Sequence, residues 1–471
     1  MFTDQKQDTG RTDGPHYPDY SQCCKRRVAR LLKHRSVSAP AALLLTATLG
    51  GVAACWHMAA GQVIYVDDAR TQYIQGTPRD SVTRLQADLE RGKVHLSFDP
   101  KFGYLPAILK ALKVSPTSQV VVFSKTSVQK DLISPENPRS IYFNDGTYVG
   151  YVPDGKALEL CTTDPYLGAV YYTLLQREVP KPKFFRTIDA CLECHADKAL
   201  KHLPRHLMFS TICNSEGAVA EGTQPFDTSD ATSLSKRFGG WFVSGSTSGQ
   251  KHMGNAFATL KGAEVTLDRK VAGDVKNLAS LYDTKLMLTP YSDIAALMTM
   301  THQYHVQNQI NEVTYRVNSA MAFERLYPRA APMNGATGHS VSTDKTVKEV
   351  CDLLLRVMLF TDEAKIPAPI TGTSGFREAF EKAGPFDSKG RSLRQLNLKT
   401  RLLKYPFSFL IYSDNFDAIP VPAKRYFYRR LHRVLDGKDH DPAFGRLTAD
   451  ERAAIREILR ATKKDFRIFG G

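Results

Sequence analysis

Two cysteines and a histidine in the stretch FRTIDACLECHADKAL (residues 185–200) have the spacing C-x-x-C-H. They are Cys191, Cys194 and His195. Two thiols three positions apart on a helical turn can each add to one vinyl group of a single haem, and the histidine that follows can bind the iron on its proximal side. The spacing therefore predicts one covalently attached haem c.

Two other kinds of site share part of this pattern. A structural zinc site needs two or more further Cys or His ligands in a second cluster, and the later cysteines Cys161, Cys213 and Cys351 form no second C-x-x-C. A thioredoxin-like dithiol needs only the C-x-x-C and does not use the histidine that follows it, and this alternative stays open. No second C-x-x-C-H occurs in the chain, which argues against a di-haem protein.

A glycine-rich segment further along the chain offers candidates for the second iron ligand. The segment GGWFVSGSTSGQKHMGN (residues 239–255) places His252 and Met253 side by side. A glycine-rich loop can approach the flat porphyrin closely, and Trp241 could pack against its edge. We therefore expect His252 or Met253 as the distal ligand, unless both serve only in packing.

Other histidines are weaker candidates. His302 shares one helix face with Met298 and His305, and it is the second choice for the distal ligand. A histidine pair on a helix also serves in core hydrogen bonds. His202 and His206 follow the motif closely, and we expect them near the haem propionates or the solvent.

An uncharged stretch near the N-terminus predicts the compartment. No Asp, Glu, Lys or Arg occurs in residues 36–66, six Lys and Arg lie within residues 25–35, and Asp67 and Asp68 follow. Because cationic flanks stay in the cytoplasm, we predict a single anchor in a bacterial inner membrane with the bulk of the chain in the periplasm. A cleaved signal peptide is the alternative.

The remaining pattern predicts an α+β fold with a β-rich N-terminal exported part, a mono-haem c segment and an all-helical C-terminal part. Short β-branched and aromatic runs separated by turn residues predict an antiparallel sheet within residues 119–175. A long helix is expected from Ser292 towards Arg325, and a capping box at Thr448 starts the last helix. The predicted regions are 1–38 (cytoplasmic basic N-terminus), 39–62 (anchor), 63–180 (β-rich region), 181–289 (haem segment and glycine-rich loop) and 290–471 (helical region).

Several stretches together resemble a known family. They include ISPENPRSIYFND (133–145), DPYLGAVYYTL (164–174), CLECHA (191–196) and YPFSFLIYSDNFDAIP (405–420). The sequence resembles bacterial membrane-anchored cytochrome c domain-containing proteins from about residue 80 to its end. The resemblance implies one haem c attached at Cys191 and Cys194, with His195 as proximal ligand, and it implies no particular reaction.

These observations predict a membrane-anchored mono-haem cytochrome that transfers electrons in the periplasm. Two alternatives remain: a haem enzyme or gas or redox sensor with an open distal site, and a docking subunit of a larger membrane oxidoreductase. The expected partners are the membrane and redox proteins of the inner membrane or periplasm. The net charge of +15 is not read as nucleic-acid binding, because no recognition motif accompanies it. No catalytic residue is assigned.

Overall fold

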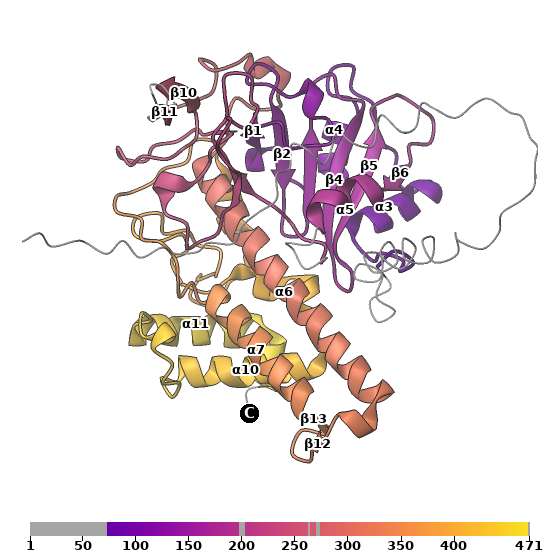
Figure 1. The fold of residues 1–471 in the computed structure, drawn as a ribbon, viewed down its shortest axis with the longest axis vertical. Helices are drawn as coiled ribbons and strands as arrows, with labels where there is room; N and C mark the ends of the chain where they lie inside the picture. The colour runs from indigo at the N-terminus through magenta and orange to yellow at the C-terminus, as the bar shows by residue number, and fades with distance from the viewer. Residues whose placement is uncertain (1–72, 197–202, 262–263, 270–273, 470–471) are drawn as a thin grey trace, which may run out of the picture. The chain divides into compact units, whose positions relative to one another are not determined.

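The computed structural model describes residues 73–196, 203–261, 264–269 and 274–469, all within one compact unit. Its centre is a seven-stranded sheet in the order β6-β5-β4-β3-β2-β1-β9, and every neighbouring pair is antiparallel (Figure 1). The strands are β1 (Val120–Val122), β2 (Arg139–Phe143), β3 (Thr147–Tyr151), β4 (Ala157–Asp164), β5 (Gly168–Leu175), β6 (Phe184–Arg186) and β9 (Trp241–Phe242). The predicted antiparallel sheet is thus confirmed.

Short turns fix the register of the central strands. Between β2 and β3 the Asn144 carboxamide accepts hydrogen bonds from the backbone N–H groups of Gly146 and Thr147, at 3.2 and 3.0 Å. An Asn side chain that bonds to the backbone two or three residues on is a common way to close such a turn. The turn sets Tyr148 opposite Phe143, which places both rings on one face of the sheet.

Helices cover both faces of the sheet. Helices α3 (Ser81–Glu90) and α4 (Leu105–Ala111) pack on the face that carries Tyr142, Val149 and Leu160. The other face, with Ile141, Phe143 and Tyr148, packs against α6 (Ile294–Leu326). Successive side chains of a strand point to opposite faces of the sheet. Because both faces are covered, strands such as β3 are buried throughout.

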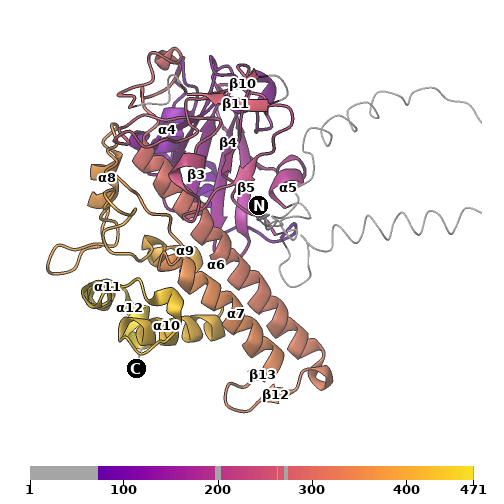
Figure 2. The same cartoon turned by 60° about the vertical axis from the view of Figure 1, so that its left-hand side comes forward.

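Helix α6 is the longest element among the described residues and links the sheet to the C-terminal helices (Figure 2). Its 33 residues span roughly 50 Å at 1.5 Å per residue. It begins at Asp293, whose carboxylate accepts a hydrogen bond from the N–H of Ala295 at 2.8 Å. Most of its first two-thirds is buried on all sides, as expected of a central helix rather than a surface one.

The C-terminal region is mainly helical, as predicted. It contains α7 (Val341–Met358), α8 (Phe376–Lys382), α9 (Asp414–Asp417), α10 (Val421–Leu435), α11 (Ala449–Thr462) and α12 (Lys464–Ile468). The predicted capping box is present at the start of α11, where Thr448 and Glu451 satisfy each other's backbone N–H groups.

Two pairs of two-residue strands and one longer hairpin complete the strands of the described residues. They are β7 (Phe209–Ser210) with β8 (Phe226–Asp227), β12 (Met333–Asn334) with β13 (His339–Ser340), and β10 (Phe257–Lys261) with β11 (Glu264–Asp268). The β12–β13 pair joins α6 to α7, so the C-terminal region is not entirely helical.

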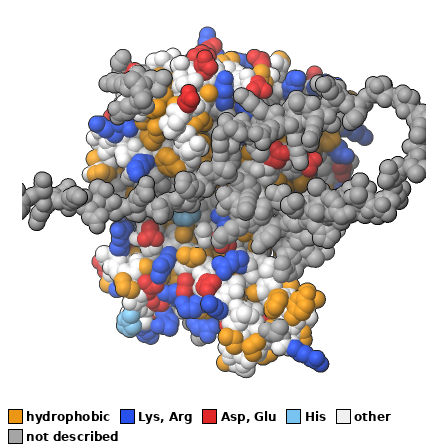
Figure 3. Space-filling model, viewed as in Figure 1, with side chains coloured by type: hydrophobic (Ala, Val, Ile, Leu, Met, Phe, Trp, Pro, Cys, Tyr) orange, Lys and Arg blue, Asp and Glu red, His pale blue; other side chains and the backbone are white. Residues whose placement is uncertain are grey.

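Hydrophobic side chains gather in Figure 3 at the end of α6 and α7 where β12 and β13 lie. Leu326, Tyr327 and Val341 are more than half exposed there.

The predicted localisation is corrected. Residues 39–62, the predicted anchor, lie outside the described residues. In the part of the chain that the structure does describe, no helix is both long enough and apolar enough to cross a membrane. The prediction of an inner-membrane protein with a single anchor and a periplasmic bulk is therefore withdrawn.

Candidate functional site

A short helix holds the two cysteines and the histidine of the C-x-x-C-H motif. Helix α5 (Asp189–His195) follows β6 and lies beside β5 in Figure 1 and Figure 2. The N–H of Thr187 donates to the carbonyl of Tyr171 at 2.9 Å, which fixes the start of the helix to the sheet. Cys191 is half-buried and Cys194 is exposed, so both thiols lie outside the hydrophobic core.

The His195 ring is held by a backbone carbonyl ten residues further along the chain. Its Nδ1 lies 2.8 Å from the carbonyl oxygen of Arg205, and the N–H of Arg205 donates to the carbonyl of His195 at 2.9 Å. A carbonyl can only accept, so Nδ1 carries the proton and the lone pair of the neutral ring is on Nε2. No described residue forms a hydrogen bond with Nε2.

The ring environment keeps His195 neutral. Burial lowers the pKa of His195, and the hydrogen bond to Arg205 opposes this only in part. The ring packs against Tyr171, with 4.7 Å between the ring centroids, and the Tyr171 hydroxyl donates to the same Arg205 carbonyl at 2.7 Å. A neutral imidazole with a fixed tautomer and a free Nε2 is the form that binds a metal ion.

Helix α6 holds the segment that orients His195. The Arg205 guanidinium pairs with the Glu312 carboxylate at 2.9 Å, and both side chains are mostly buried. The Asn308 carboxamide accepts from the N–H of His206 at 3.0 Å and donates to its carbonyl at 2.8 Å. Residues 205 and 206 are therefore fixed by three polar contacts to one helix.

A mostly buried ion pair on the sheet influences the Cys191 thiol. Arg139 of β2 and Glu159 of β4 are 2.7 Å apart. Burial raises the pKa of Cys191 to about 12, with a further increase from the Glu159 carboxylate and an opposing effect of Arg139. Thiol–disulfide enzymes need a lowered thiol pKa. The raised pKa of Cys191 thus disfavours the thioredoxin-like alternative.

The lack of a side chain at Gly150 leaves room for the Arg139 guanidinium over the sheet. A Cβ atom at Gly150 would lie 2.5 Å from Nη2 of Arg139. The Ser127 hydroxyl donates to Glu159 at 2.7 Å and the Gln129 carboxamide donates to it at 3.0 Å. The Glu159 carboxylate is therefore held by three side chains.

A second cluster of polar groups lies between β4 and α6. The Nδ1 of His206 is 3.4 Å from Sγ of Cys161, and its Nε2 is 2.9 Å from the Thr163 hydroxyl. The ring stacks on Tyr304, with centroids 5.3 Å apart. Burial lowers the pKa of His206 to about 3, and His195 adds to this shift. His206 was predicted at the propionates or in solvent; it is buried, with both ring nitrogens occupied. His202 lies outside the described residues.

The structure does not bring the first-choice distal ligands to α5. Trp241 is in β9, at the opposite edge of the sheet from β6, and Asn255 binds its backbone. The Trp241 indole N–H donates to the carbonyl of Phe209 at 2.8 Å. His252 accepts from the N–H of Gly254 at 3.0 Å, and Met253 accepts from the Ser210 hydroxyl at 3.7 Å. No described hydrogen bond or ring contact joins Trp241, His252 or Met253 to His195, so the structure does not bring these candidates together with the motif.

His302, the second choice, has both ring nitrogens engaged elsewhere. Nδ1 lies 2.8 Å from the Asp230 carboxylate, and Nε2 lies 2.8 Å from the Ser408 hydroxyl. Burial acts to raise the pKa of Asp230, but the charge and hydrogen bond of His302 outweigh it and hold that pKa well below its usual range. The ring stacks on Phe360, with centroids 4.2 Å apart. His302 thus makes core hydrogen bonds, which was the alternative to iron ligation.

The order Ser408–His302–Asp230 is that of a serine hydrolase triad. The exposed fractions are 0%, 0% and 5%, so no substrate could reach the hydroxyl. We interpret these residues as a structural network.

The prediction of a metal-binding protein is also corrected. Within the described ranges, no group of three or more His, Cys, Asp and Glu side chains could hold a metal ion. A haem brings its own four nitrogen ligands and needs only one from the protein on its proximal side. The residues of α5 fit that requirement, because His195 offers an oriented Nε2 and two thiols precede it on the same short helix.

Sequence reasoning missed the residues that position this site. They lie in four different parts of the chain: β2 (Arg139), β4 (Glu159), the segment after α5 (Arg205) and α6 (Asn308 and Glu312). The contact to His195 is made by a backbone carbonyl, which every residue has, so no sequence signal could have indicated it. No protein-family model, curated protein or solved structure matched the chain. The resemblance to cytochrome c domain-containing proteins therefore stays a prediction.

Proposed function

We propose that the protein carries one covalently attached haem c and transfers single electrons. The observation that supports this most directly is the hydrogen bond from Nδ1–H of His195 to the carbonyl of Arg205, at 2.8 Å. A metal-binding histidine almost always donates its other ring N–H to a carbonyl or carboxylate. This bond leaves Nε2 as the ligand atom.

Each residue of the site has a definite task in this proposal. Cys191 and Cys194 form the two thioether bonds, and His195 is the proximal ligand. The bound haem supplies an iron centre whose one-electron potential depends on its axial ligands and on the polarity around it. Tyr171 and the Arg205 carbonyl prevent rotation of the His195 ring, and Glu312 and Asn308 keep Arg205 in place.

The experiment is a pyridine haemochrome spectrum of the full chain, expressed with haem c maturation proteins and extracted with acid and acetone. A c-type α-band that survives extraction supports the proposal. The double variant Cys191→Ser/Cys194→Ser should lose the covalent haem. The matched control Cys351→Ala changes a buried cysteine on α7 and should retain it. Extractable or absent haem in the native chain would overturn the proposal.

A second candidate is a haem protein with a sixth position that an external ligand can occupy. The observation in its favour is that no described contact joins His252 or Met253 to His195, together with the full engagement of His302. A six-coordinate electron carrier resists carbon monoxide, whereas an accessible iron binds it. Rapid carbon monoxide binding to the ferrous protein would favour a ligand-binding or catalytic role over simple electron transfer.

A further inference from the structure

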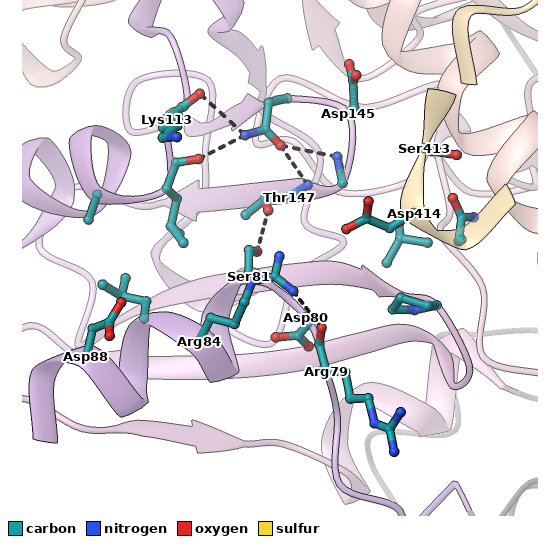
Figure 4. Close-up of a pocket in the computed structure, with 18 of the residues that line it drawn as sticks. Arg79, Asp80, Ser81, Arg84, Asp88, Lys113, Asp145, Thr147, Ser413 and Asp414 are labelled. Atoms are coloured by element: carbon teal, nitrogen blue, oxygen red, sulfur yellow. Dashed lines mark hydrogen bonds between the residues drawn. The ribbon is translucent and has the colours of Figure 1, made fainter. Parts of the chain in front are cut away.

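A cavity of about 600 Å³ lies between the start of α3, the β2–β3 turn and the segment that leads into α9 (Figure 4). None of the motif residues lines it. Four carboxylates and three Arg or Lys side chains share its wall, so the cavity indicates no single class of ligand. A surface at the C-terminal end of α6 has a more uniform composition.

Exposed apolar side chains are concentrated where α6 ends and α7 begins. Five of them lie within residues 323–341, with exposed fractions from 42% to 69%: Phe323, Leu326, Tyr327, Met333 and Val341. Fifteen large hydrophobic side chains are exposed in the described ranges, so one-third of them belong to this short segment. Large exposed apolar patches mark contact sites for proteins or membranes. We refer to this surface as the α6–α7 tip.

Hydrogen bonds hold the tip in a defined shape. The Glu324 carboxylate at the end of α6 accepts from Nδ1–H of His339 and from the N–H of Ser340, both at 2.8 Å. The Asp344 carboxylate of α7 accepts from two side chains of the β12–β13 hairpin, both at 2.7 Å. Both carboxylates therefore serve within the tip, and the apolar side chains extend from a fixed scaffold.

The cationic side chains of the tip are not engaged in this way. Arg325, Arg329 and Lys345 are exposed, and none of them forms an ion pair or a side-chain hydrogen bond with a described residue. Lys345 lies one helical turn after Val341 and hence on the same face of α7. In Figure 3, Lys or Arg side chains lie at the margin of the hydrophobic patch. The tip thus presents positive charge beside apolar surface.

This combination favours a lipid surface over a protein as the partner. Figure 1 and Figure 2 place the tip at the far end of the α6–α7 pair, past α10 and α11, where it can reach a flat surface. Apolar and aromatic side chains beside Lys and Arg bind the interface of an anionic bilayer, and tyrosine is common at the headgroup level. A second copy of the chain fits less well, because two tips that met would bring like charges together.

We propose that the α6–α7 tip binds the surface of an anionic lipid bilayer. Leu326, Tyr327 and Met333 enter the headgroup layer, and Arg325 and Arg329 contact the lipid phosphates. Only side chains at the surface take part, and no helix crosses the bilayer. The proposal is independent of haem attachment, because the tip shares no residue with the motif.

Tyr327→Trp tests the contact in the full chain, with vesicles that mix phosphatidylglycerol and phosphatidylcholine. The fluorescence of the new indole should shift to shorter wavelength and be quenched by brominated lipid, beyond the change in the native chain with its two tryptophans. Tyr166→Trp, at an exposed tyrosine between β4 and β5, is the matched control and should show no added change. No added quenching at residue 327 would overturn the proposal.

Co-sedimentation with the same vesicles tests the charges. Arg325→Gln/Arg329→Gln should weaken binding by about tenfold, because it removes two contacts with anionic lipid. The control Arg425→Gln/Arg429→Gln removes two exposed arginines of α10 and should retain native affinity. Both variants keep residues 36–66, so the comparison isolates the tip. Equal affinity of the two variants would overturn the assignment to an anionic surface.

Sedimentation velocity without lipid tests the second copy as an alternative occupant. We expect no dimer that forms through the tip. A concentration-dependent dimer that Leu326→Ser/Met333→Ser abolishes would assign the tip to self-association and overturn the proposal.

Discussion

His195 and Arg205 are joined twice: Nδ1–H of the imidazole donates to the Arg205 carbonyl at 2.8 Å, and the Arg205 N–H donates to the His195 carbonyl at 2.9 Å. The two bonds fix residues 195 and 205 to each other. The orientation of the imidazole then depends on whatever holds Arg205, and the relevant contacts come from α6.

Asn308→Ala should destabilise the protein by about 2 kcal/mol, because it removes two hydrogen bonds and leaves the N–H and carbonyl of His206 unpaired in a buried region. Urea unfolding followed by circular dichroism measures the loss. Asn318→Ala, further along the same helix, makes no such contact and serves as the control. Equal stability of the two variants would show that Asn308 does not hold the segment.

Gly150→Ala should destabilise the protein by about 1 kcal/mol, because the new methyl group displaces Arg139 from Glu159. The same substitution should have little effect in an Arg139→Ala background, and this double-mutant cycle isolates the contact. Gly146→Ala, where a Cβ atom would meet nothing within 4 Å, is the control. An undiminished effect in the Arg139→Ala background would mean that the methyl group acts elsewhere.

His302→Leu should cost about 3–5 kcal/mol, because it leaves the buried Asp230 carboxylate without its partner. Ser408→Ala removes a single hydrogen bond and should cost about 1 kcal/mol. A fluorophosphonate probe should not label Ser408 in the native protein. Labelling that disappears in Ser408→Ala would contradict a purely structural role.

Glu363 should make stability depend on pH near neutrality. Burial raises its pKa to about 7, although the Leu402 N–H donates to the carboxylate at 2.7 Å and opposes the shift. The unfolded chain loses the Glu363 proton above the ordinary glutamate pKa of about 4.3, whereas the folded protein keeps this proton up to a higher pH. Its contribution to stability is complete below that value and declines as pH rises through 7.

Thermal unfolding of Glu363→Gln checks this dependence. The variant should gain stability relative to the native chain at pH 8, on the order of 1 kcal/mol, and should show little gain at pH 4. The exposed Glu378→Gln is the matched control. A gain of equal size at both pH values would mean that charge at Glu363 is not the cause.

Much of the fold followed from local patterns in the sequence. The β-branched and aromatic runs between turn residues predicted the central strands, and the capping box at Thr448 marks where α11 begins. The long helix was expected from Ser292, and α6 is capped one residue later, by Asp293. These signals act within a few residues and need no tertiary information. The strand β9 was missed, because a two-residue strand in a glycine-rich segment has no periodicity to detect.

The candidate site was predictable only in its local part. The spacing of Cys191, Cys194 and His195 is local, and the structure places them on one short helix. The choice of His252 and Met253 relied on composition, which does not say at which edge of a sheet a loop will lie. Strand order is a property of the whole chain, so a partner for His195 could not be chosen from neighbouring residues.

Helix α6 has a consequence for how small a working version of this protein can be. Asn308 and Glu312 support the segment around Arg205, while His302, two turns earlier on the same helix, is buried against Ser408 of the C-terminal region. Amide hydrogen exchange should accordingly report that the motif segment and the C-terminal helices open together. A shortened chain that ends after the sheet would lack α6, which holds Arg205 and thereby the His195 ring. The roughly 280 residues beyond the motif are therefore needed to position the histidine and do not form a separable domain.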